Sequence, residues 1–115
     1  MGLHRVLRAF EIAAHPTLRA DLLRLAVLSV VGGIWGDADD RCCGSLEMIT
    51  EPGFDLILLQ EDIGTIGNNF IAAAPQHPFI QYALSVVTNN ILERDGDSIW
   101  FISGPGALTL AFCHF

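Results

Sequence analysis

The stretch that most constrains the fold is an uncharged apolar run from Leu25 to Gly36, which ends at a group of carboxylates. The run continues a helical pattern that we predict over residues 18–31, with Thr17 as the N-cap. This helix is apolar on most of its surface, so we expect it to be buried. Gly32 and Gly33 end it, because glycine is the residue most often found just past a helix C-terminus.

Three aspartates follow the apolar run almost directly. We predict a short strand over residues 34–39 that leaves the core, with Asp37, Asp39 and Asp40 at its exposed end. Neighbouring carboxylates repel one another and are costly to remove from water. These three side chains must therefore either lie in water on a turn or be held by a cation.

The composition limits the partners that this chain can take. Its 115 residues predict one domain, and a hydrophobic share of 51 % with 17 % charged residues argues against disorder. The formal net charge of −7, without a basic cluster, argues against a nucleic-acid surface and against attraction to acidic lipid. An acidic site for a divalent cation is compatible with this charge.

The sequence shows no pattern of export or of a membrane span. The apolar run is too short to cross a bilayer, and the N-terminus lacks a signal-peptide pattern. The odd number of cysteines (Cys42, Cys43 and Cys113) predicts reduced thiols in an intracellular, cytoplasmic protein. A zinc site from these cysteines and His114 would lack the usual C-x-x-C spacing, so small buried residues are favoured.

Helices and strands alternate along the rest of the chain, which predicts the α/β class. Pro16 ends the first helix, because the residue before a proline disfavours the helical region. Residues 78–94 carry an apolar stripe at helical spacing, which Asp95-Gly96 stops. The other expected elements are a helix over 4–15, strands over 54–60, 70–74 and 98–102, a loop over 64–69, and a last helix through 107–112 with Pro105 at its first position.

Common binding motifs do not account for the aspartates. An EF-hand loop counted from Asp37 fails at Arg41, Cys42 and Met48. The sequence contains neither a Rossmann fingerprint nor a Walker A loop, and it has no local signature of a catalytic Ser-His-Asp or Cys-His group. The remaining candidate is an Asp-x-Asp site that shares Mg²⁺ or Mn²⁺ with a diphosphate. Taken alone, the same pattern occurs constantly in solvated turns.

Four ordered segments give the Asp-x-Asp pattern a context. They are Ala20-Asp21-x-x-Arg24, Gly32-Gly33-Ile34-Trp35-Gly36-Asp37-Ala38-Asp39, NNFIAAAPQHPFI and SGPGALTLAF. Their order and spacing resemble those of glycosyltransferases that have a sugar-binding region containing the DXD motif. This group includes bacterial capsular-polysaccharide transferases, the initiating α-mannosyltransferases of the fungal Golgi and, more distantly, the glucosylating clostridial toxins.

The resemblance implies a GT-A fold, which is a Rossmann-like α/β sandwich that binds a nucleotide sugar. Residues 1–115 would form a single partial domain around the DXD core. The family's first strand and its C-terminal part have no counterpart here, and Ser103 stands where the family more often has Thr. We therefore expect a fragment with a partial site.

The resemblance also implies roles for single residues. Asp39 would be the direct ligand of Mn²⁺ or Mg²⁺, and Asp37 would support the metal and contact the ribose or sugar of the donor. Asp21 and Arg24 would bind hydroxyls of the donor sugar, and their i, i+3 spacing puts them on one helix face. The alternative for these two is an intrahelical ion pair without a ligand. Trp35 either packs on the donor or belongs to the core.

The resemblance marks further positions. Asn69, with Asn68 as a second candidate, stands where the family has a polar contact to the donor, but asparagines after glycine are also ordinary turn formers. We expect Asp40 to be solvated and His77 to begin a helix, and we assign no catalytic residue. Gly104-Pro105-Gly106 either brings a helix N-terminus near phosphate or forms a simple turn.

The resemblance implies a metal-dependent and retaining transfer of a sugar, from a nucleotide-diphosphate sugar to a saccharide or other hydroxyl acceptor, in polysaccharide biosynthesis. In the full-length protein this would take place in the cytoplasm or at the membrane surface. One alternative is a non-catalytic fragment that binds nucleotide sugar weakly or not at all. Another is an acidic metal-binding or interaction domain, in which Asp21 and Arg24 would have no role.

Overall fold

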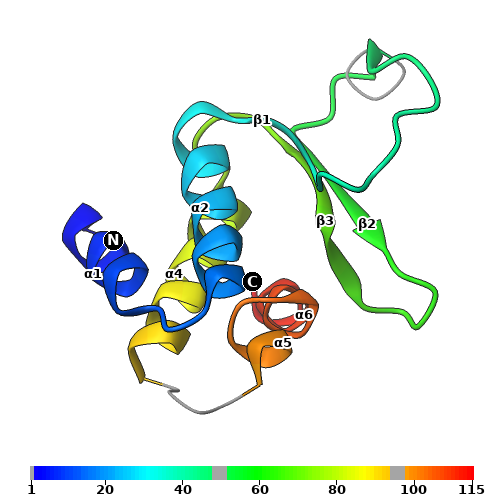
Figure 1. The fold of residues 1–115 in the computed structure, drawn as a ribbon. Coiled ribbons are helices and arrows are strands. Elements are labelled where there is room, and N and C mark those ends of the chain that lie inside the picture. The colour runs from blue at the N-terminus through cyan, green and yellow to red at the C-terminus, as the bar shows by residue number, and fades with distance from the viewer. Residues whose placement is uncertain (1, 48–51, 94–97) are drawn as a thin grey trace.

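The structure is a computed structural model that describes residues 2–47, 52–93 and 98–115. A group of helices lies beside a small sheet, and the sheet projects away from them (Figure 1). This mixed arrangement confirms the expected class. The helices are α1 (Leu3–Ile12), α2 (Pro16–Val31), α4 (Pro78–Glu93), α5 (Ile99–Ile102) and α6 (Pro105–His114), and the strands are β1 (Gly33–Gly36), β2 (Leu56–Gln60) and β3 (Ile66–Ala73). None of the described helices is long and apolar enough to cross a membrane.

Strand β3 is the centre of the sheet. The strand order is β1-β3-β2, and β3 pairs with both neighbours in the antiparallel direction. The register places Gly36 opposite Phe70. Just past the end of β1, the amide of Asp37 donates to the carbonyl of Asn69 at 3.1 Å. The aspartates that follow β1 therefore lie beside the asparagines of β3.

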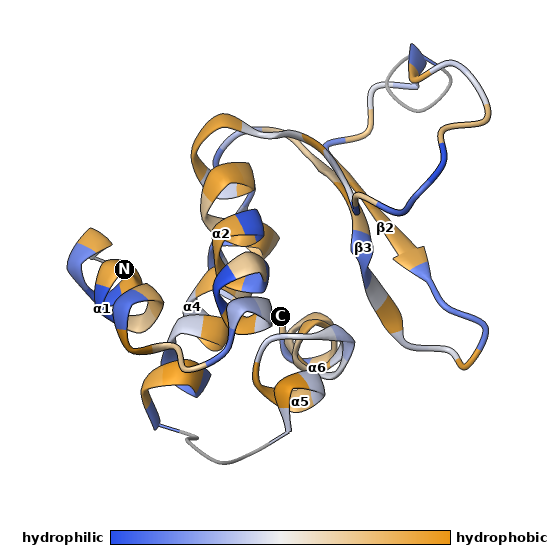
Figure 2. Cartoon of the chain, viewed as in Figure 1, coloured by the Kyte–Doolittle hydropathy of each residue, from blue (hydrophilic) through white to orange (hydrophobic). Residues whose placement is uncertain are grey.

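The core lies where α2 and α4 pack together, with α1, α6 and β3 around them. Figure 2 shows hydrophobic residues along α2 and α4, and hydrophilic ones in the segment that follows β1. The prediction that the apolar helix is buried holds for one face only. The largest fully buried side chains are Phe79, Leu22, Ile71, Ile80, Val87 and Thr88, whereas the outer face of α2 exposes Leu23, Val27, Val30 and Val31.

Gly32 turns the chain from α2 into β1, as the sequence predicts. Its φ of +66° lies in the left-handed region that favours glycine. A Cβ at this position would lie 2.6 Å from the backbone nitrogen of Pro75 and 2.8 Å from the carbonyl oxygen of Ala73. The close approach of these two chain segments brings β1 back beside the helix that precedes it.

The two N-terminal helix boundaries differ from the prediction. Thr17 is not the N-cap of α2, because His15 takes that position and Pro16 is the first helical residue. The Nδ1 atom of His15 accepts from the amide of Thr17 at 3.2 Å. Proline suits a first helical position, since the amide it lacks would have no partner there. The preceding helix α1 ends at Ile12, earlier than residue 15.

The predicted loop over residues 64–69 is wrong, because β3 begins at Ile66. Gly64, with a φ of +94°, lies in the tight turn after β2, which the Glu61 amide closes by donating to the Thr65 carbonyl at 2.7 Å. Glycine and asparagine are poor strand formers. Here they lie where the pairing of β3 with β2 shifts, because Leu58 is opposite Ile71 whereas Leu59 is opposite Gly67.

The predicted strand over residues 98–102 is also wrong, since residues 99–102 form the short helix α5. Four apolar residues in a row do not distinguish a buried strand from a helical turn. The amides of Phe101 and Ile102 both donate to the Ser98 carbonyl. Packing against the following turn thus decides the conformation.

The remaining elements agree with the sequence in part. Helices α4 and α6 are confirmed, with Pro105 at the start of α6. The predicted stop of α4 at Asp95-Gly96 lies outside the described residues. Strand β1 ends at Gly36, before the aspartates. Strand β2 is half-exposed rather than buried, because it lies at the sheet edge.

Gly32→Ala should destabilise the fold by about 1–3 kcal/mol, because alanine disfavours a positive φ and its Cβ would meet backbone atoms. Urea unfolding followed by circular dichroism measures this. Gly36→Ala is the matched control, since no atom lies within 4 Å of a Cβ there. Equal unfolding midpoints for the two variants would contradict this view of the α2–β1 connection.

Candidate functional site

The site is built around the buried carboxylate of Asp21 on α2, whose side chain is 8 % exposed. Its Oδ1 accepts from Arg24 Nη1 at 2.8 Å and from Asn68 Nδ2, on β3, at 3.3 Å. Its Oδ2 accepts from the hydroxyl of Ser103 at 2.8 Å. One carboxylate thus joins the middle of α2, the central strand and the turn between α5 and α6.

Arg24 connects this carboxylate to the aspartates after β1. Its side chain is 7 % exposed, and its Nη2 donates to Asp37 Oδ1 at 3.2 Å. The guanidinium lies 4.9 Å from the ring centre of Trp35. Its Nε is buried without a hydrogen bond from the described residues. Arg24 is therefore a buried cation between two carboxylates and an aromatic ring.

Trp35 lies at the edge of the hydrophobic core and also positions Asp37. Its ring packs against the hydrophobic core, and its Nε1 donates to Asp37 Oδ1 at 3.1 Å. Asp37 is 34 % exposed, and no hydrogen bond among the described residues involves its Oδ2. One carboxylate oxygen is thus held by the protein while the other is available to a ligand.

Residues 37–40 form a tight turn that presents Asp39. The amide of Asp40 donates to the Asp37 carbonyl at 2.9 Å. The Asp40 carboxylate accepts in return from the Asp37 amide at 3.2 Å and from Asn69 Nδ2 at 3.4 Å. Asp40 is exposed, as expected, but it also stabilises the turn. Asp39 lies exposed at the tip.

The two asparagines of β3 contact different parts of the site. Asn68 contacts the buried Asp21, and Asn69 contacts the turn at Asp40. Of the residues predicted for the site, Asp21, Arg24, Trp35 and Asp37 are connected by these contacts. The expected contacts of Asn69 and of Trp35 with the nucleotide-sugar donor stay predictions.

A cavity of about 360 Å³ opens beside this network. Part of its wall is polar and comes from α2, from Asp37 just after β1 and from β3, and part comes from α5 and the start of α6. The Gly104-Pro105 segment is thus both the N-terminus of α6 and a wall of the cavity. The lining residues are Thr17, Ala20, Asp21, Arg24, Asp37, Asn68, Ile99, Trp100, Gly104 and Pro105.

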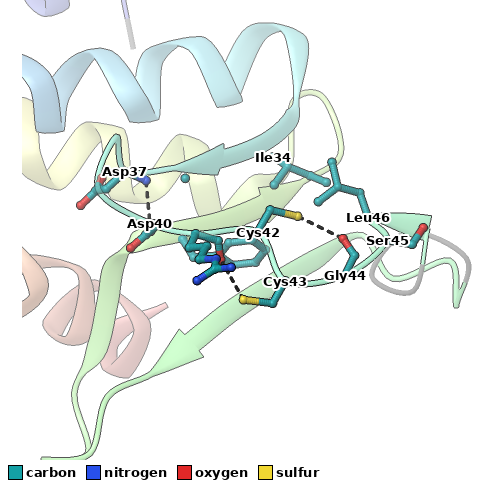
Figure 3. Close-up of a pocket in the computed structure, with 11 residues that line it drawn as sticks. Ile34, Asp37, Asp40, Cys42, Cys43, Gly44, Ser45 and Leu46 are labelled. Atoms are coloured by element: carbon teal, nitrogen blue, oxygen red, sulfur yellow. Dashed lines mark hydrogen bonds between the residues drawn. The ribbon is translucent and has the colours of Figure 1, made fainter.

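A second, larger hollow of about 570 Å³ is lined by Ile34, Phe70 and the segment after β1 (Figure 3). Asp37 lines both hollows, so the aspartate turn lies between them. In the larger one, Cys42 Sγ donates to the carbonyl of Gly44 at 3.0 Å.

The prediction for the cysteines holds in part. Cys42, Cys43 and Cys113 are free, but all three are exposed rather than buried. The first two lie in the segment after β1, and the third lies in the last turn of α6. In the part of the chain that the structure describes, no three His, Cys, Asp or Glu side chains gather to hold a metal, so the alternative zinc site is not formed there.

The donor set nevertheless suits a hard divalent cation. Asp39 and the open oxygen of Asp37 offer carboxylate oxygens, the donor type that Mg²⁺ and Mn²⁺ prefer. Mg²⁺ is usually held by one or two carboxylates together with substrate phosphates and water. The two aspartates therefore fit a cation that arrives with a diphosphate better than one bound by protein alone.

Burial raises the pKa of Asp21, because the apolar surroundings disfavour its charged form. The hydrogen bond from Ser103 and the charge of Arg24 oppose this shift, but they do not cancel it. The nearby charge of Asp37 raises the pKa further.

This raised pKa predicts a pH dependence of stability. The contribution of Asp21 is fully present below the ordinary aspartate pKa and is lost as the pH rises through the raised pKa of the folded state. The free energy of unfolding should thus fall for the natural chain relative to Asp21→Asn once the pH rises above the ordinary aspartate pKa of about 3.9. Asp62→Asn, an exposed aspartate, is the matched control. Urea titrations that run parallel for the natural chain and Asp21→Asn would refute this effect.

Sequence reasoning missed Ser103 as a partner of Asp21, and it gave Asn68 only a secondary place. Ser103 lies 82 positions from Asp21 along the chain, and Asn68 lies 47 positions away. The sequence indicated these two residues only by their place in the segments NNFIAAAPQHPFI and SGPGALTLAF, which resemble the glycosyltransferase family.

Comparisons with known proteins bear on the same residues. Residues 4–62 match a family model described as "Glycosyltransferase sugar-binding region containing DXD motif". Two relatives from Saccharomyces cerevisiae are the mannosyl phosphorylinositol ceramide synthases SUR1 and CSH1. The first is 31 % identical over 84 % of this chain and 23 % of its own length, and the second is 34 % identical over 64 % and 19 %.

Among solved structures, the PaToxG glycosyltransferase has a similar fold, with a TM-score of 0.80 at 23 % identity. The match covers 96 % of this chain and 40 % of that one. The chain therefore shares the fold of part of a glycosyltransferase. It spans less than a quarter of the length of the two yeast relatives.

Proposed function

The chain belongs to the family of glycosyltransferases with a sugar-binding region containing the DXD motif, and on this premise we propose that it binds a nucleotide-diphosphate sugar. In the full protein this sugar is transferred to a hydroxyl of a saccharide or other acceptor. The observation that carries the proposal is the continuous contact from Asp21 through Arg24 to Asp37 along one cavity.

The polar wall of the cavity suits a sugar. A carboxylate accepts hydrogen bonds from hydroxyls, and a guanidinium with five N–H groups donates to them. Asp21 and Arg24 stand next to each other in this wall, so one hydroxyl pair can meet both. An ion pair without a ligand would need no cavity beside it, which favours the binding site over that alternative.

The turn at residues 37–40 suits the diphosphate end of the donor. We propose that Asp39 and Asp37 hold Mn²⁺ or Mg²⁺ together with the donor phosphates. When bound, such a cation stabilises the negative charge of a diphosphate leaving group. Arg24 and Trp35 keep the Asp37 carboxylate in one orientation. Retention of anomeric configuration is proposed from the family resemblance alone.

The nature of the donor sugar and the acceptor is open to direct test. The names of the two yeast relatives refer to mannosyl phosphorylinositol ceramide, which makes a mannosyl nucleotide one of the donors to try. This chain spans only part of its relatives, so a non-catalytic role of the chain alone is the second candidate. Donor binding, which both candidates allow at different strength, is therefore measured before turnover.

Asp39→Ala should lower the affinity for nucleotide sugars by at least about tenfold, because it removes a hard oxygen ligand from the shared cation. Calorimetric titration of UDP- and GDP-sugars with Mn²⁺, repeated with a chelator, measures the effect. Asp62→Ala, which removes an exposed carboxylate outside the site, should bind like the natural chain. Equal affinity with Mn²⁺ and with chelator would rule out the metal-dependent site.

A further inference from the structure

The cavity beside Asp21 has two chemically different walls. Asp21, Arg24 and Asn68 present charges and an amide. Other lining residues come from α5 and the turn that follows it, and the largest of them is Trp100. A volume of about 360 Å³ lies near the lower end of the range for small-molecule sites, which is about 300–1,000 Å³. A ligand of this cavity is therefore small and has both polar and apolar surfaces.

Trp100 is held firmly in this wall. Its indole lies so close to Gly106 that a Cβ there would be 2.5 Å from Cε3 and 2.6 Å from Cζ3. The Phe101 ring meets it edge-on, with 4.8 Å between ring centres and an interplanar angle of 89°. Gly104 completes the support, because a Cβ at this position would lie 3.1 Å from the Trp100 Cα. Gly104 and Gly106 thus let the turn approach Trp100 more closely than residues with a Cβ would allow.

The same tryptophan remains accessible from the cavity. Trp100 is 37 % exposed although Gly106 and Phe101 cover part of its ring. Trp35, the other tryptophan of the chain, is engaged differently, since Arg24 lies over its ring and its Nε1 donates to Asp37. Trp100 therefore lines this cavity with part of its surface uncovered, whereas Trp35 does not line it.

A pyranose matches the two walls. Its hydroxyls form a polar rim, whereas its ring carbons present apolar C–H groups above and below. Aromatic side chains contribute large apolar contact surface, and small-molecule sites combine such surface with a few placed polar groups. A sugar whose hydroxyls meet Asp21 and Arg24 would turn its C–H groups toward the opposite wall.

We propose that Trp100 is a specificity-determining residue of the donor site, where its indole packs against the C–H face of the sugar. The inference rests on the proposed function and deepens it, because it assigns sugar recognition to a side chain outside the DXD motif. Recognition of the nucleotide diphosphate then depends on the aspartate turn, and recognition of the sugar depends on Trp100.

The test compares ligands with and without the sugar. UDP-glucose, GDP-mannose, UDP and GDP are titrated by calorimetry in the presence of Mn²⁺. Trp100→Ala should weaken binding of the preferred nucleotide sugar by about three- to tenfold and leave the affinity for the matching nucleoside diphosphate unchanged. Trp100→Phe keeps an aromatic ring and should recover most of the loss. Phe54→Ala, which removes an aromatic ring that is 73 % exposed, should bind like the natural chain.

A measurement on the unaltered residue complements the variants. In protein labelled with 5-fluorotryptophan, the two tryptophans give separate ¹⁹F resonances, which Trp100→Phe assigns. The Trp100 resonance should shift with the nucleotide sugar and not with the nucleoside diphosphate. Gly106→Ala should abolish this difference, because its Cβ displaces the indole without removing it.

The outcomes separate this inference from the proposed function. If Trp100→Ala binds the nucleotide sugar like the natural chain, the role of Trp100 is overturned while the proposed function stands. The same holds if Trp100→Ala weakens sugar-bearing and sugar-free ligands equally, since Trp100 would then support the fold or the nucleotide. If the natural chain binds none of the ligands with Mn²⁺, both proposals fail.

Discussion

The buried ion pair between Asp21 and Arg24 is the interaction on which the rest of the site depends. Removing two charges from water is costly, and such a pair is often no more stable than a well-packed apolar one. Removing only one partner, however, typically costs about 3–5 kcal/mol, because the other charge stays buried and unpaired. The hydrogen bonds from Asn68 and Ser103 therefore matter as much as the pair itself. They bind β3 and the α5–α6 turn to the middle of α2.

The connection at Gly32 brings the aspartates after β1 beside this ion pair. Helix α2 runs directly into β1, and the close approach of Gly32 to Pro75 turns the strand back past the helix. Asp37 thus returns to within 3.2 Å of Arg24 although thirteen positions separate them. Local chain geometry, rather than a long-range crossover, brings the polar wall of the cavity and the aspartate turn together.

The sequence predicted the parts of the site that lie within one continuous motif. Asp21, Arg24, Trp35 and Asp37 fall between residues 20 and 39, where helix and strand signals are strong. It did not predict the roles of Ser103 or Asp40, because their partners depend on tertiary contacts. The apolar segment that contains Trp100 was assigned to a strand for the same reason. Its helical conformation depends on packing against glycines that follow it.

The central claim is that Arg24 couples the polar wall of the cavity to the aspartate turn. It is tested most directly by a double-mutant cycle of Arg24→Gln and Asp37→Asn, measured as the binding free energy of a nucleotide sugar with Mn²⁺, with circular dichroism to show that all four proteins fold. Residues in one hydrogen-bonded network show coupling energies of about 0.5–3 kcal/mol. The account predicts a coupling of at least about 1 kcal/mol, within that range. Additive losses would contradict it.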